Sequence, residues 1–164
     1  MSDRVDYFAF RKTLEDQLSK LKLPHDCTAQ EPSWEITAPP YFWTLELFFN
    51  FTDKQHIRIW ESYEKIAGLQ MSRRLQWAYH YGIITATDDN GNTMQGSPDD
   101  PFEVRIDTCS GLHLHYQQRE PHYDQSQVAN LGLKSVDAFK FIHAVFKRRK
   151  TGQPFTKTLG FTVT

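Results

Sequence analysis

The sequence predicts an α+β fold, in which an antiparallel sheet of four to six strands carries an N-terminal and a C-terminal helix. Three observations lead to this class. Apolar residues recur at steps of three or four near both ends of the chain, they alternate at steps of two through the middle, and no second set of elements follows. The length of 164 residues suits a single domain, residues 1–164, with a substantial hydrophobic core.

The first helix is expected over residues 1–22, with Ser2 and Asp3 as candidate caps. The apolar residues that recur there at helical spacing are Val5, Phe8, Leu14, Leu18 and Leu21. We expect this stripe to be buried on the protein's own sheet. Residues 23–40 hold four prolines and are predicted to form a connector rather than an element of the sheet.

Strands are predicted over residues 41–120. The alternation of apolar and polar residues is clear in three runs, at 43–52, 56–63 and 74–84. In the third run, Trp77 marks the predicted apolar face. The residues predicted on the opposite, polar face of that run are Arg74, Gln76 and His80.

An Asp-Asn-Gly sequence at residues 89–91 predicts a tight turn, because Asn and Gly accept positive φ. Beyond it we expect a second group of strands, in which Arg105, His113 and His115 share the polar face. A closing helix is predicted over residues 135–150. It ends in four basic residues that complement the helix dipole, Lys147, Arg148, Arg149 and Lys150.

Composition limits the partners and the location. The formal net charge is −1, so a polyanion would have to be held by a local patch and not by a global positive field. The N-terminal residues lack an apolar signal-peptide core, and no apolar run approaches the roughly 20 residues that span a bilayer. We therefore expect a cytoplasmic protein without a membrane partner, with Cys27 and Cys109 as reduced thiols.

The motif His113-Leu-His115 is the strongest candidate for a site. On a strand, residues i and i+2 point to one face with Cα atoms roughly 6.5–7 Å apart. Two imidazoles can act as base and acid on one RNA phosphodiester near neutral pH, with a cation to stabilise the phosphorane. The candidate catalytic residues are His113, His115, Arg119, His122 and His80. The candidate nucleic-acid-binding residues are Arg74, Arg105, Lys147, Arg148, Arg149 and Lys150.

Two alternatives remain open for these histidines. The spacing His113-x-His115-x4-Glu120 resembles the first metal motif of cupins, and such ligands suit Fe, Mn, Zn or Ni. The rest of the cupin pattern is missing, so no metal and no cofactor is predicted. The histidines could equally line the polar face of a half-buried sheet without any catalytic role.

From Trp60 to the closing helix, the chain resembles the TumE-type toxins of toxin–antitoxin pairs. The resemblance rests on Trp77-Ala78-Tyr79-His80-Tyr81, on the Asp-Asn-Gly turn, on Leu112-His113-Leu114-His115, and on Pro121-His122. It implies a cognate antitoxin encoded beside the gene and nucleic acid as the target, whereas residues 1–40 depart from the family. The resulting prediction is a toxin-like protein that acts on RNA by metal-independent histidine chemistry. The sequence leaves open whether the protein is an enzyme, which would then be a ribonuclease. It also leaves open whether the protein forms a homo-oligomer. The first alternative is a non-enzymatic protein-binding or assembly module, and the second is a metal-dependent enzyme.

Overall fold

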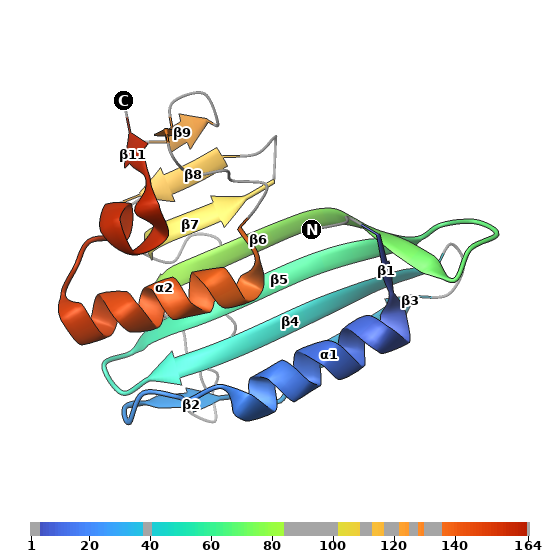
Figure 1. Cartoon of the computed structure of the whole chain (residues 1–164), viewed down its shortest axis with the longest axis horizontal. Helices are drawn as coiled ribbons and strands as arrows, with labels where there is room; N and C mark the ends of the chain where they lie inside the picture. The colour runs from blue at the N-terminus through green and yellow to red at the C-terminus, as the bar shows by residue number, and fades with distance from the viewer. Residues whose placement is uncertain are drawn as a thin grey trace, which may run out of the picture.

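A computed structural model describes residues 4–37, 41–83, 102–108, 113–116, 122–124, 128–129 and 136–163. It confirms the α+β class, with an antiparallel sheet, an N-terminal helix and a C-terminal helix (Figure 1). Within the described residues the main sheet has nine strands, which is more than the four to six predicted. No helix in this part of the chain is both long enough and apolar enough to cross a lipid bilayer.

Three long strands form the centre of the sheet: β4 (Phe42–Phe51), β5 (Gln55–Lys65) and β6 (Met71–Ile83). Their alternation of apolar and polar residues is the pattern that the sequence displays, because one face is buried under the helices. A turn connects β4 to β5, and Lys54 adopts a positive φ of 66° there. The tight turn predicted at residues 89–91 lies outside the described residues.

The sheet continues past β6 through β7 (Phe102–Asp107), β8 (His113–Tyr116) and β9 (His122–Asp124), each antiparallel to its neighbour. The strand β9 lies beyond the region predicted to hold strands. A separate two-stranded sheet pairs β10 (Val128–Ala129) with β11 (Thr162–Val163), which follows the π-helical turn η3 (Thr156–Gly160).

Helices α1 (Tyr7–Lys20) and α2 (Ala138–Thr151) cover the same face of the sheet (Figure 1). Each begins at an aspartate whose carboxylate accepts a backbone N–H three residues on, at 2.8 Å in both cases: Asp6 for α1 and Asp137 for α2. Gly152, with φ 69°, ends α2 in the left-handed conformation that glycine accepts without strain.

Residues 1–40 differ most from expectation. The helix begins at Tyr7 rather than at residue 1, because Arg4–Asp6 form strand β1 and pair with β6. The predicted connector contains two strands, β2 (Cys27–Ala29) and β3 (Ser33–Thr37), which both pair with β4. Pro24 precedes β2 and Pro32 precedes β3, so neither interrupts a strand, as proline allows at a sheet margin.

The hydrophobic core lies between the helices and the sheet. Leu14 docks α1 on the sheet as predicted, but Phe8 of the same predicted stripe is 77% exposed. The α2 side contributes Phe141 and Val145, which are completely buried. The sheet contributes the apolar faces of strands β4 to β8, including Leu45, Leu47, Phe49, Ile57, Ile59, Tyr79, Val104, Ile106 and Leu114.

Candidate functional site

Basic residues line up across five neighbouring strands. In the register of the sheet, Arg58 pairs with His80, His80 with Arg105, Arg105 with His115, and His115 with His122. At roughly 4.8 Å between strands, the line spans about 19 Å. We call these five positions the basic row. Its members on β5–β7 alternate with core residues, so the row occupies the sheet face opposite the helices.

The basic row brings together four residues that the sequence singled out, namely His80, Arg105, His115 and His122, and adds Arg58. His115 is half-buried at this position. The register also pairs His113 with Asp107 and Asp124. For His113 and His122 the structure describes the strand position alone, and Arg119 lies outside the described residues.

His80 is buried, with 8% of its surface exposed, and its ring stacks on that of His56 at a centroid distance of 4.9 Å. Burial lowers the pKa of His80 to about 3, and Coulomb interactions with His56, Arg105 and Arg58 act in the same direction. His80 is therefore neutral near pH 7. It can hold a hydrogen bond there, but it does not supply a proton as a general acid.

His56 is a member of this environment that sequence reasoning missed. It is completely buried, and its ring stacks between Phe48, at 5.1 Å, and His80. The sequence does indicate its face, because His56 lies two residues before Arg58 on the same strand and residues i and i+2 share a face. Nothing in the local sequence marks the residue as buried.

Carboxylates accompany both arginines of the basic row. Arg58 Nε lies 2.5 Å from Glu46 Oε1, and Arg105 Nε lies 2.6 Å from Asp107 Oδ2. Asp107 is completely buried. These ion pairs fix the guanidinium groups on the sheet face and balance part of their charge.

Arg74 does not join the basic row, and this corrects its predicted face. Ser62 pairs with Gln76 whereas Tyr63 pairs with Arg74, so a β-bulge leaves Leu75 as an extra residue. Such a bulge reverses the parity of the residues before it. Arg74 consequently turns to the helix-covered face.

On that face Arg74 belongs to a buried polar network. Its Nη1 lies 3.3 Å from Glu61 Oε1 and 3.1 Å from the hydroxyl of Tyr79. Glu61, 3% exposed, also accepts hydrogen bonds from the hydroxyls of Tyr63, at 2.5 Å, and of Tyr79. Burial, followed by the charge of Glu61, raises the pKa of Tyr79 well above its usual value. The network satisfies a buried carboxylate, and this explains Arg74 without a ligand.

The basic cluster at the end of α2 also divides. Arg148 pairs with Glu103 at 2.9 Å. Arg149 pairs with Asp26 at 2.5 Å and with Asp53 at 3.0 Å, and its guanidinium lies 3.9 Å from the ring centroid of Phe51. The two arginines therefore attach α2 to other elements.

Lys147 and Lys150 line a groove beside α2, on the helix side of the sheet. None of the four basic residues at the end of α2 belongs to the basic row.

The metal alternative depends on Glu120, which lies outside the described residues. Within the described ranges no three His, Cys, Asp or Glu side chains gather closely enough to hold a metal ion. Cys27 is a free, buried thiol, and burial raises its pKa to about 11. Comparisons of the chain with protein-family models, with curated proteins and with solved structures found no match.

Proposed function

We propose that the protein acts on RNA as the toxin of a toxin–antitoxin pair, with the basic row as its phosphate-binding face. The observation that carries this proposal is the alignment of the basic row. Residues 58, 80, 105, 115 and 122 are scattered through the sequence, yet they occupy directly paired positions on adjacent strands. Cationic and imidazole groups gathered along one line can contact several phosphates of one RNA strand, whereas an isolated charge contacts one.

In this proposal His115 and His113 perform the proton transfers. One imidazole removes the proton of the 2′-hydroxyl, that oxygen attacks phosphorus, and the other imidazole protonates the leaving 5′-oxygen. Arg105 pairs directly with His115, so its guanidinium is suited to stabilise the charge of the phosphorane. His80 acts as a neutral positioning residue next to Arg105, which is a narrower role than the sequence suggested.

The cleavage of a single-stranded RNA by purified protein tests this proposal. Replacing His115 or His113 by Ala should lower the cleavage rate by about 10²–10⁴-fold, the usual contribution of a positioned proton transfer. His25→Ala is the matched control, because His25 is exposed and lies on the loop before β2. Activity should depend on pH with a bell-shaped profile and persist in chelator.

Two results would count against the proposal. If the wild-type protein neither cleaves RNA nor arrests growth when expressed without its antitoxin, the toxin function is wrong. If His115→Ala loses thermal stability in proportion to activity, His115 is structural. The alternative of a protein-binding module is favoured by a groove between the two helices, on the opposite face of the sheet.

A further inference from the structure

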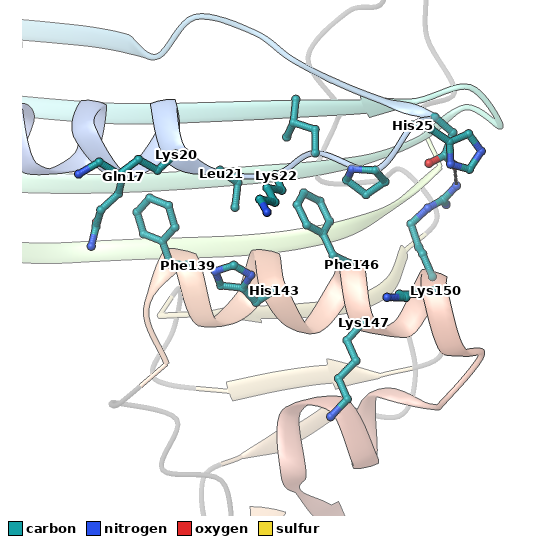
Figure 2. Close-up of a pocket in the computed structure, with 14 residues that line it drawn as sticks. Gln17, Lys20, Leu21, Lys22, His25, Phe139, His143, Phe146, Lys147 and Lys150 are labelled. Atoms are coloured by element: carbon teal, nitrogen blue, oxygen red, sulfur yellow. Dashed lines mark hydrogen bonds and ion pairs between the residues drawn. The ribbon is translucent and has the colours of Figure 1, made fainter.

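A large groove separates the two helices on the helix-covered face (Figure 2). Its volume is about 1130 Å³, and its walls come from the end of α1, the loop that follows and the length of α2. We call it the interhelical groove. A second cavity of about 260 Å³ shares Gln17 and Phe139 with it and extends it toward the start of α2. The resulting trough runs between two helices, each about 21 Å long at 1.5 Å per residue.

One wall is a helical stripe of α2 that is only partly buried against the core. Phe139, His143, Phe146 and Lys150 succeed one another at steps of four, three and four on α2. In Figure 2 Phe139, His143 and Phe146 point from α2 toward the α1 side of the groove. The buried core residues of α2 form the adjoining face of the helix, and Phe139 and Phe146 extend its apolar surface into the groove.

Packing and an ion pair anchor this wall to the rest of the fold. Phe146 packs edge-to-face on Phe49 and Phe51, with centroids 6.2 and 6.3 Å apart. At the end of the groove, the ion pair between Arg149 and Asp26 holds the loop after α1 against α2. A groove that is fixed before a ligand arrives costs less ordering entropy on binding.

Positive charge surrounds this apolar surface. Lys20 and Lys22 line the α1 side, and Lys150 lines the α2 side. Lys147 also lines the groove but points away from α1 in Figure 2. Within the described part of the chain none of these four lysines takes part in an ion pair, although the whole chain carries a net charge of −1. The concentration of unneutralised lysine at an apolar groove favours an occupant that is anionic and apolar at once.

We propose that the interhelical groove binds an acidic amphipathic helix of a partner protein. A helix fits because both walls carry residues at three- and four-residue steps, the pattern into which the ridges of a third helix pack at an axis separation of about 8–10 Å. Its apolar side chains would contact Leu21, Phe139 and Phe146. Its acidic side chains, on both flanks of that apolar stripe, would reach Lys20 and Lys150. This inference is independent of the RNA proposal, which concerns the other face of the sheet.

Designed peptides test the chemistry of the groove with the full chain. The probe is a fluorescent helical peptide of about 18 residues, or five turns, with Leu at helical spacing and Glu on both flanks. A control peptide carries Lys in place of Glu. Lys20→Glu/Lys150→Glu is the test variant. Lys12→Glu/Lys157→Glu is its matched control, because both residues are exposed, neither lines the groove and the change in net charge is the same.

The acidic peptide should bind at least about tenfold more tightly than the basic one, and its affinity should fall as salt rises. The test variant should lose about tenfold or more in affinity, the matched control should not, and amide shifts should map to α1 and α2. The inference is overturned if the two peptides bind alike or if the test variant binds as wild type does. Binding of phosphatidylglycerol vesicles without peptide binding would assign the groove to lipid instead. Dimerisation of wild type that the test variant abolishes would assign it to a second copy. Either result would overturn the inference as well.

Discussion

Acid should destabilise this protein through His80 more steeply than its carboxylates alone would. Because burial and neighbouring positive charge lower the pKa of His80 in the folded state to about 3, an unfolded chain with an ordinary histidine pKa of 6.5 binds a proton that the folded chain rejects. Because the pKa of His80 is lower in the folded state than in the unfolded state, its contribution to the free energy of unfolding is fully present above pH 6.5. That stability is lost progressively as the pH falls from 6.5 toward 3.

The size of the effect follows from the difference between these values. It is 6.5 − 3, or about 3.5 pH units, and each unit corresponds to about 1.36 kcal/mol, so the complete effect is about 5 kcal/mol. Between pH 7.5 and 4.5 the loss attributable to His80 should be about 3 kcal/mol. A loss of that size is a large fraction of the 5–15 kcal/mol by which domains are commonly stable.

Urea unfolding at half-unit steps from pH 7.5 to 4.5 measures this contribution. The variant His80→Gln retains a polar side chain that does not titrate. Below pH 6.5 its free energy of unfolding should therefore fall less steeply with acid than that of wild type, and the two slopes should differ by about 1.4 kcal/mol per pH unit. His25→Gln, which changes an exposed histidine, should keep the wild-type slope. Parallel slopes for wild type and His80→Gln would refute the assignment of a buried neutral imidazole.

Three further predictions concern ion pairs and a buried thiol. Arg149→Met should lower the free energy of unfolding by about 1–2 kcal/mol in urea titrations, because it removes two partly exposed ion pairs. Glu61→Gln should cost about 3 kcal/mol in the same assay, since Arg74 loses its buried counter-charge; an unchanged midpoint would contradict this. In a Cys109→Ser background, Cys27 should react with iodoacetamide at pH 8 only after unfolding, as mass spectrometry would show.

The sequence predicts the long strands well because their physical cause is local. Residues 43–51 and 57–63 alternate between buried and half-buried positions, apart from the buried Phe48, and that alternation is visible residue by residue. The short strands are different. Arg4 pairs with Arg73, and helix α1 and strands β2 to β5 lie between these two residues in the sequence. Strand β1 therefore forms because of a partner that is distant in sequence and not because of a pattern of its own. The same reason hides β2 and β3, which depend on β4.

For the candidate site, the sequence predicts the face of the sheet on which each residue lies, but it does not predict how the strands pair. Alternation places His80, Arg105 and His115 on one face, whereas their alignment depends on the lengths of the connections and on each bulge. A single extra residue in β6 sent Arg74 to the other face. Arg149 and Asp26 are 123 positions apart in the sequence, so no local pattern could have paired them.

The two proposed surfaces differ in how their positive charge is balanced, and this makes them separable. In the basic row Arg58 and Arg105 are each held by a carboxylate, whereas the lysines of the interhelical groove have no ion pair among the described residues. An incoming phosphate must therefore compete with Glu46 and Asp107 at the row, but a polyanion could also bind the groove lysines without competition. RNA bound at the row should lose affinity in Arg105→Gln and keep it in Lys20→Glu/Lys150→Glu. The reverse pattern would place the RNA in the groove, and the acidic peptide would then displace it.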